Sequence, residues 1–110
     1  MKSHCQKTQL DRRLKLHKML EECLGSKNVY FEPPPNLMMK YPCIRYKRVR
    51  FDPQYADNHP YKLVTAYELT LIYRDPDNDI AFKLAQLPMC RNDRSYTANN
   101  LSHDTFTIYF

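Results

Sequence analysis

Glycine is almost absent from this 110-residue chain, which contains one glycine and no tryptophan. Phosphate-binding loops and dinucleotide-binding fingerprints need several glycines, because the backbone must approach the phosphate closely. A chain with Gly25 as its single glycine therefore lacks the motifs of the commonest nucleotide-binding enzymes. The nine tyrosines that it does contain suit half-buried strands and contact surfaces, where the ring is covered and the hydroxyl stays hydrated.

Long hydrophobic runs and paired cysteines are also missing. No N-terminal stretch resembles a signal peptide, and no run approaches the roughly 20 apolar residues of a membrane span, so we expect a cytoplasmic origin and no membrane partner. Cys5, Cys23, Cys43 and Cys90 form no C-x-x-C pair, which argues against a zinc ribbon or a small disulfide framework. We expect free, mostly buried thiols. An inter-subunit disulfide formed after lysis stays open as an alternative.

The charges are unevenly distributed along the chain. Residues 1–51 contain twelve Lys/Arg and four acids, whereas residues 52–110 contain five Lys/Arg and eight acids, so the two parts have formal net charges of +8 and −3. This asymmetry indicates two differently charged surfaces, which suit two different partners or head-to-tail packing around a ring. A solvated basic face without a partner is the alternative. The length favours a single domain over residues 1–110, with a flexible terminus at residues 1–7.

Two segments have the signals of helices. Thr8 and Asp11 have the spacing of a capping box at the start of residues 8–24, and Gly25 supplies the stop. The expected apolar stripe of this helix comprises Leu10, Leu14, His17, Leu20 or Glu21, and Leu24, and its expected outer side carries Arg12, Arg13, Lys15 and Lys18. We expect His17 to be a partly buried core histidine rather than a ligand. A second helix is expected over residues 76–87, with Asp75 as the N-cap.

The remaining segments predict strands. Two central runs, residues 43–51 and 62–74, predict a hairpin whose connection contains Pro53, Asn58 and Pro60. In the second run one face carries Leu63, Thr65, Tyr67, Leu69, Leu71 and Tyr73, because side chains alternate along a strand. A short strand at residues 29–32 ends at a proline triplet, and a C-terminal hairpin is expected over residues 89–97 and 103–110 with a turn at Asn99 and Asn100.

These elements predict an α+β fold. Their order is α-β-β-β-α-β-β, with a mainly antiparallel sheet flanked by two helices. The first central strand carries charges on both faces, which a fully buried strand could not tolerate, so it must be an edge, an exposed ribbon or a strand covered by a partner. Basic residues between aromatic ones also suit contact with a nucleic-acid backbone. The pattern alone does not choose between these interpretations.

No motif in the sequence predicts catalysis, a cofactor or a metal site. The acidic run at residues 75–79 resembles a calcium loop, but Ile80 stands where that loop needs glycine and Gln86 where it needs a bidentate glutamate, so we interpret the run as a helix cap. The four histidines lie in unrelated contexts, and no serine or cysteine stands in a nucleophile motif. We therefore expect no enzymatic activity, although a site assembled by folding would escape this search.

Several short blocks, in order along the chain, resemble a family of small tailed-bacteriophage proteins. The blocks are LGSKNVYFEPPPN, YPCIRY, YADNHPY, YRDPDND, LAQLPMC and NDRSYTANNLSHDTFTIYF, and they lie within residues 24–110. This family groups with tail terminators and related neck proteins. The resemblance implies a tail-terminator-like α+β fold, and it supplies no catalytic motif.

The resemblance implies a structural role in the virion, in the tail or neck. A tail terminator forms a ring, usually a homohexamer, on the head-proximal end of the tail tube, stops tube polymerisation and offers a surface for head–tail joining. The implied partners are copies of the chain itself, the tail tube protein, head–tail connector or neck proteins, and DNA in the lumen. The candidate interface residues are Tyr41, Arg45, Tyr46, Lys47, Arg48, Arg50, Tyr55, Asp57, Asn58 and Tyr61.

Two alternatives compete with this interpretation. A head-completion or connector adaptor of the neck would bind the portal side instead of the tail tube. A small basic nucleic-acid-binding protein, from a different functional class, would use the basic strand and the first helix. DNA affinity that falls steeply with salt would favour the nucleic-acid-binding alternative, whereas ring formation with negligible DNA binding would favour the joining role.

Overall fold

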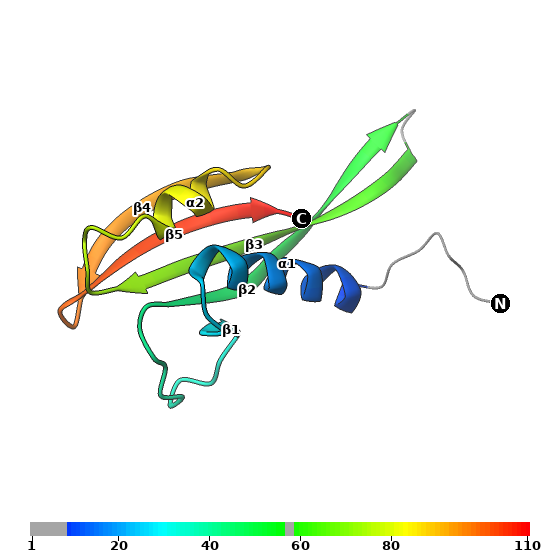
Figure 1. The fold of residues 1–110 in the computed structure, drawn as a ribbon. Coiled ribbons are helices and arrows are strands. Elements are labelled where there is room, and N and C mark those ends of the chain that lie inside the picture. The colour runs from blue at the N-terminus through cyan, green and yellow to red at the C-terminus, as the bar shows by residue number, and fades with distance from the viewer. Residues whose placement is uncertain (1–8, 57–58) are drawn as a thin grey trace.

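The described residues fold into one mixed sheet with two helices on the same face. The computed structural model describes the backbone of residues 9–56 and 59–110 and the side chains of residues 10–50 and 65–110. Its elements follow the order α-β-β-β-α-β-β, and Figure 1 shows α1 and α2 on one side of the five strands. The predicted α+β class is confirmed. The predicted capping residue Thr8 and the terminus at residues 1–7 lie outside the described residues.

The helices and strands have definite bounds and pairings. The elements are α1 Gln9–Leu24, β1 Val29–Phe31, β2 Cys43–Ala56, β3 His59–Tyr73, α2 Ile80–Ala85, β4 Cys90–Ala98 and β5 Leu101–Tyr109. The strands are arranged in the order β1-β2-β3-β5-β4. β1 runs parallel to β2, and the other neighbours are antiparallel, so the sheet is mainly antiparallel, as the strand pattern predicted.

The predicted hairpin turn at Asn99 and Asn100 and the predicted helix end at Gly25 are confirmed. Asn99 and Asn100 join β4 to β5 with φ angles of 54° and 63°, and a two-residue hairpin turn with both φ angles positive is the kind that asparagine tolerates best after glycine. Gly25 ends α1 with a φ of 82°, and its N–H donates to the carbonyl of Glu21 at 2.8 Å. The positive φ is costly for most other residues, which favours glycine at this position.

The central strands are longer than the sequence pattern predicted. Pro53 pairs with Leu63 and Pro60 with Tyr55, so both prolines lie inside the hairpin strands rather than in the connection. Asn58 of the predicted connection lies outside the described residues. A proline is tolerated in a strand where the missing N–H would face away from the ladder. The sequence pattern therefore predicted too early an end for β2 and too late a start for β3.

The far halves of β2 and β3 leave the five-stranded body as a two-stranded ribbon (Figure 1). Pairing between β3 and β5 starts at Ala66, and β1 pairs with β2 only at residues 44–46. In the described chain, residues 51–56 of β2 pair only with residues 59–65 of β3, and residues 59–64 of β3 pair only with β2. We call this part the ribbon.

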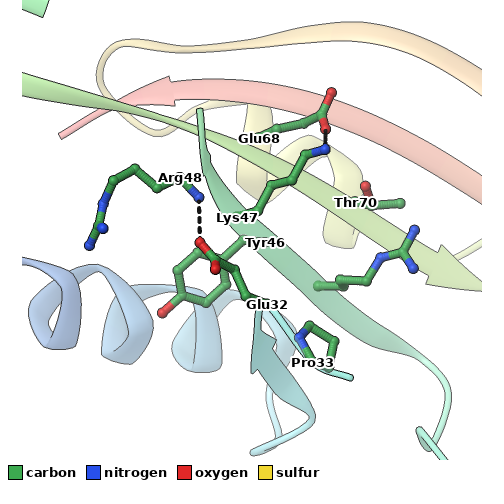
Figure 2. A pocket seen from close by; sticks show the side chains of 8 residues that line it. Glu32, Pro33, Tyr46, Lys47, Arg48, Glu68 and Thr70 are labelled. Atoms are coloured by element: carbon green, nitrogen blue, oxygen red, sulfur yellow. Dashed lines mark hydrogen bonds and ion pairs between the residues drawn. The ribbon is translucent and has the colours of Figure 1, made fainter. Parts of the chain in front are cut away.

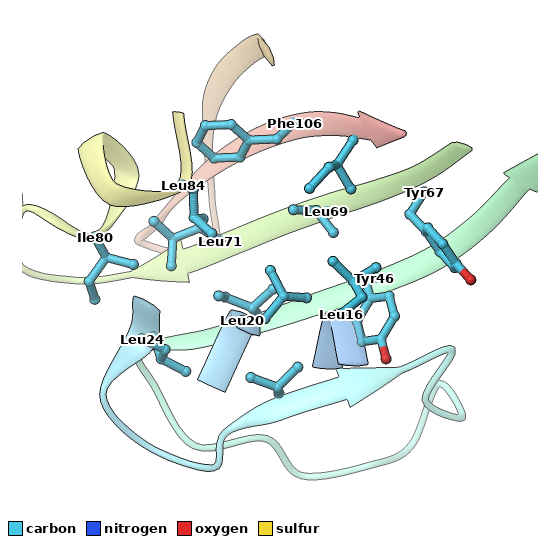
Figure 3. Close-up of a cluster of buried hydrophobic side chains, with 13 residues drawn as sticks. Leu16, Leu20, Leu24, Tyr46, Tyr67, Leu69, Leu71, Ile80, Leu84 and Phe106 are labelled. Atoms are coloured by element: carbon cyan, nitrogen blue, oxygen red, sulfur yellow. The ribbon is translucent and has the colours of Figure 1, made fainter. Parts of the chain in front are cut away.

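The main core lies between the helices and one face of the sheet. The buried side chains in Figure 3 come from α1, α2 and the helix-facing positions of four strands. They are Leu16, Leu20, Leu24, Val29, Ile44, Tyr46, Tyr67, Leu69, Leu71, Ile80, Leu84, Phe106 and Ile108. Tyr67, Leu69 and Leu71 confirm the predicted face of the second central strand.

The predicted buried face of α1 is partly wrong. Leu10 and Leu14 are 55% and 50% exposed, whereas Leu16, which was not assigned to the stripe, is fully buried. Leu16, Leu20 and Leu24 are spaced four residues apart and form the actual contact line. Lys15 and Lys18 are exposed as expected, but Arg12 and Arg13 are half-buried: Arg12 Nη2 donates to the carbonyl of Phe110 at 2.6 Å. The long arginine stems cover the sheet where leucine was expected.

The second helix is shorter than predicted and begins later. It covers only Ile80–Ala85, and Asp79 rather than Asp75 precedes it. The Asp75 carboxylate accepts the N–H of Asp77 at 3.0 Å, and the Asn78 side-chain oxygen accepts the N–H of Ile80 at 3.0 Å. Short polar side chains that bond nearby backbone groups compete with helix formation. The acidic run is therefore a turn ahead of the helix.

The burial difference along α1 predicts unequal effects of two similar truncations. Leu20→Ala should lower the free energy of unfolding by about 2–5 kcal/mol, because it leaves a cavity in the core. Leu14→Ala, on the same helix but half exposed, is the matched control and should change it by about 0.5 kcal/mol or less. Urea unfolding followed by circular dichroism measures both. Equal losses for the two variants would contradict the observed orientation of α1.

Candidate partner-binding surface

The second face of the sheet carries no helix in the described chain (Figure 1). Most of its side chains are polar, and Cys43, Ile72 and Leu101 form a small apolar cluster on it. Side chains on this face alternate with the core residues along each strand. We call it the open face, and its polar and aromatic residues are Arg45, Lys47, Arg50, Glu68, Thr70, Arg91, Arg94, Tyr96, His103, Thr105, Thr107 and Tyr109. The face is basic, because its five Lys/Arg outnumber two acids: Glu68, and Asp93, whose carboxylate lies 3.2 Å from Arg91 Nε.

Contacts within the open face hold several of these side chains. Lys47 Nζ lies 3.5 Å from a Glu68 carboxylate oxygen, and Arg50 Nη2 donates to the Tyr109 hydroxyl at 2.7 Å. The Lys47–Glu68 pair is exposed, so it contributes little to stability. Its consequence is that the charge of Lys47 is partly neutralised before any partner arrives.

An aromatic pair lies on the outer part of the open face. The rings of Tyr96 and His103 stack with centroids 4.8 Å apart, and the guanidinium carbon of Arg94 lies 5.1 Å from the Tyr96 ring centroid. Opposite register positions on β4 and β5 bring Tyr96 and His103 together. No motif in the sequence indicated this group, because the pairing of Tyr96 with His103 depends on the register between the two strands.

A hollow opens where β1 ends beside β2. The backbone of Glu32 has a φ of 45°, its N–H donates to the carbonyl of Tyr46 at 2.8 Å, and its carboxylate accepts the N–H of Arg48 at 3.3 Å. Pro33 then directs the chain away, because it cannot donate to the ladder. The Glu32 side chain therefore takes the place of the next strand residue at the edge of β2.

This hollow has a volume of about 490 Å³. Figure 2 shows the side chains around it, with Lys47 reaching Glu68 and Glu32 bonded to the backbone of Arg48. We call it the basic hollow, and its lining residues are Glu32, Pro33, Arg45, Tyr46, Lys47, Arg48, Glu68 and Thr70. Four of the interface candidates predicted from the sequence, Arg45, Tyr46, Lys47 and Arg48, thus line one site.

The other candidate residues are distributed differently. Arg50 is exposed beyond a register shift in β2. Tyr41 is 37% exposed, and the guanidinium carbon of Arg74 lies 5.8 Å from its ring centroid. The side chains of Tyr55 and Tyr61, and residues Asp57 and Asn58 altogether, lie outside the described part of the structure.

Tyr46, which the sequence predicted as an interface residue, instead belongs to the core. Its side chain is 1% exposed and belongs to the core, because strand alternation places it on the same face as Ile44. Its hydroxyl accepts a bond from Arg13 at 3.2 Å and lies 2.8 Å from Nδ1 of His17. Burial raises the pKa of Tyr46. Tyr46 therefore anchors α1 to the sheet, and its side chain is not a surface contact.

His17 is partly buried beside Tyr46, as predicted. Its Nε2 atom lies 3.5 Å from a carboxylate oxygen of Glu21, one helical turn further along α1. In the described residues, no cluster of three or more His, Cys, Asp or Glu side chains could hold a metal ion. Neither helix in that part of the chain is long and apolar enough to cross a membrane.

The comparisons with known proteins give no relative. No protein-family model matches the chain, and a search of curated proteins finds no match either.

Cys43 lies under the loop that joins β1 to β2. It forms a second small core with Ile72 and Leu101, and Tyr30 and Met39 pack against this cluster. The described cysteines are free: Cys43 is buried, and Cys23 and Cys90 are half-buried. Burial raises the pKa of Cys43 to about 11 and that of Cys90 to about 11. Both thiols are therefore neutral and weakly nucleophilic at neutral pH.

These raised pKa values predict a loss of stability at alkaline pH. The unfolded thiols ionise near pH 9.0, whereas the folded ones keep their protons up to about pH 11, so the free energy of unfolding should fall as the pH rises through that window. Urea unfolding at a series of pH values measures the fall. A Cys43→Ala/Cys90→Ala variant should lose less stability over the same window. A parallel decline in both proteins would show that other groups cause it.

Proposed function

We propose that this chain is a virion structural protein of a tailed bacteriophage, acting as a tail terminator at the junction of head and tail. The observation that carries the proposal is the ordered set of sequence blocks within residues 24–110 that resembles this family. In this role, copies of the chain form a ring on the head-proximal end of the tail tube. The ring stops tube polymerisation and offers a surface to the head connector.

The ribbon supports an assembly role. A two-stranded hairpin that stands alone is only marginally stable in water, and its free edges are templates for pairing with another chain. Residues 51–56 and 59–64 extend this ladder beyond the five-stranded body. A neighbouring subunit that pairs with or covers the ribbon would supply the missing support.

The two-sided architecture supports the same role. The helices cover one face of the sheet, whereas the open face presents charged and aromatic side chains to the surroundings. A terminator must contact the tube on one side and offer a different surface on the other, so it needs distinct polar surfaces more than a catalytic pocket. A stable contact between subunits would bury on the order of 1,000 Å² or more, with arginines and tyrosines as favoured anchors.

Antibody labelling of purified phage particles tests this proposal. We expect a label directed at this chain to lie at the head–tail junction in electron micrographs, and to stay with tails that have detached from heads. An antibody against the tail tube protein is the control for access to the particle. Label that stays with the heads would favour the connector-adaptor alternative. Absence of the chain from virions would overturn a structural role.

The aromatic and arginine group on the open face favours a second candidate function, nucleic-acid binding. Stacked rings and an arginine above them are the contacts that single-stranded nucleic acid uses. If this function holds, the isolated protein should bind DNA with an affinity that falls steeply between roughly 50 and 200 mM salt. A Tyr96→Ala variant should then bind more weakly, whereas equal binding by the variant and the wild type would remove the reason for this candidate.

A further inference from the structure

An acidic loop follows the end of β3. It contains Asp75, Asp77 and Asp79, all exposed, and we call residues 75–79 the acidic loop. The Asp79 side chain is 74% exposed and lies 4.0 Å from Lys83. The loop concentrates three of the acids that make residues 52–110 negative.

Internal hydrogen bonds hold the acidic loop in one shape. The Asp75 carboxylate accepts the N–H of Asp77 at 3.0 Å. The Asn78 side-chain amide donates to the carbonyl of Asp75 at 2.6 Å and its oxygen accepts the N–H of Ile80 at 3.0 Å. The carboxylates of Asp77 and Asp79 take no part in these bonds. A loop arranged in advance loses little freedom on binding, so its carboxylates are suited to recognition by a partner.

The basic hollow is the complementary surface. Arg45 is exposed, and the described part of the chain offers it no ion-pair partner. Lys47 shares its charge with Glu68 at 3.5 Å, and Glu32 also lines the hollow. Two carboxylates among the cations would repel a continuous phosphate backbone, whereas a compact loop with a few carboxylates can meet Arg45 and avoid them. The charge pattern therefore favours a protein loop over a nucleic acid.

The acidic loop of a subunit lies away from its own hollow. Thr70 lines the hollow, whereas none of residues 75–79 does, and β3 continues from Thr70 to Tyr73, about 10 Å at a strand rise of 3.3–3.4 Å per residue, before the bend that leads to the loop. The loop then continues into α2 on the helix-covered face of the sheet (Figure 1). The two charged features thus lie apart on one molecule, and a contact between them requires two molecules.

We propose that the acidic loop of one copy docks into the basic hollow of a second copy, with Asp77 against Arg45. This contact uses different surfaces on the two partners, and such head-to-tail contacts close into a ring or continue as a filament. The inference rests on the proposed ring-forming role and names the surfaces that would form the ring. The hollow, at about 490 Å³, has room for side chains of an entering loop.

Charge exchange tests the contact. The full-length variants Arg45→Glu and Asp77→Lys each place like charges together, so each should raise the apparent dissociation constant of the oligomer at least about tenfold. A 1:1 mixture of the two variants restores opposite charges at every contact, and so does the double variant. Both should recover the oligomer mass of the wild type in size-exclusion chromatography with light scattering. The matched control, Lys18→Glu on the exposed side of α1, should behave as the wild type does.

Each outcome decides the inference. Circular dichroism of each variant shows whether it is folded. Added salt should weaken the wild-type oligomer, because the Debye length falls from about 10 Å at 0.1 M to 3 Å at 1 M and the charges of the contact are then screened. A monomeric wild type, single variants that assemble normally, or a mixture that fails to recover would overturn the contact. Loss of DNA binding in Arg45→Glu, with no effect of Asp77→Lys on assembly, would assign the hollow to a polyanion instead. None of these results bears on virion labelling, so the ring-forming role can survive the failure of this contact.

Discussion

The antiparallel pairing of β2 with β3 is the interaction on which the rest of the structure depends. β1 and β5 add to the outer edges of this pair, both helices cover one of its faces, and the ribbon is its continuation. Its register also separates core from surface, because a slip of one residue would exchange the two faces of a strand. In the observed register Tyr46 and Leu69 are buried while Lys47 and Glu68 meet on the open face. A single ladder thus sets the core, the hollow and the exposed ribbon.

Covering the sheet on one side only has a chemical consequence. Most of the large apolar side chains lie on the helix-covered face, whereas the open face carries mainly arginines, threonines and tyrosines around one small apolar cluster of Cys43, Ile72 and Leu101. On the helix-covered side, Arg12 and Arg13 also combine packing with hydrogen bonding. Their stems pack against the rest of the protein, and their guanidinium groups donate to the Phe110 carbonyl and the Tyr46 hydroxyl. Long charged side chains therefore contribute to packing as well as to the charge of the surface, and the basic strand β2 can lie inside the sheet between β1 and β3.

Much of the fold could be predicted from local patterns. The element order, the Gly25 stop, the asparagine turn and the core face of β3 all follow from backbone preferences or a period of two. The errors share a cause: each depended on a competing interaction that local pattern does not contain. Leu16 rather than Leu14 is buried, because only one line of side chains along α1 can face the sheet. Asp75 and Asn78 form hydrogen bonds with the backbone of a turn, so the helix does not begin at Asp75. The interface prediction for Tyr46 came from the resemblance of the block YPCIRY, which does not say on which face of the strand each residue lies.

The sequence by itself determined the class of the fold, the unequal charge of its two parts and the lack of recognisable catalytic motifs, since all three depend on residue type and spacing alone. Only the tertiary structure decided that Arg45, Lys47 and Arg48 surround one hollow with Glu32, which enters from another strand, and that the acidic loop lies apart from it. Those relations depend on the parallel addition of β1 beside β2 and on where β1 stops. A pattern of side chains along one strand carries no information about the strand that will pair with it, so the site could emerge only when the chain had folded.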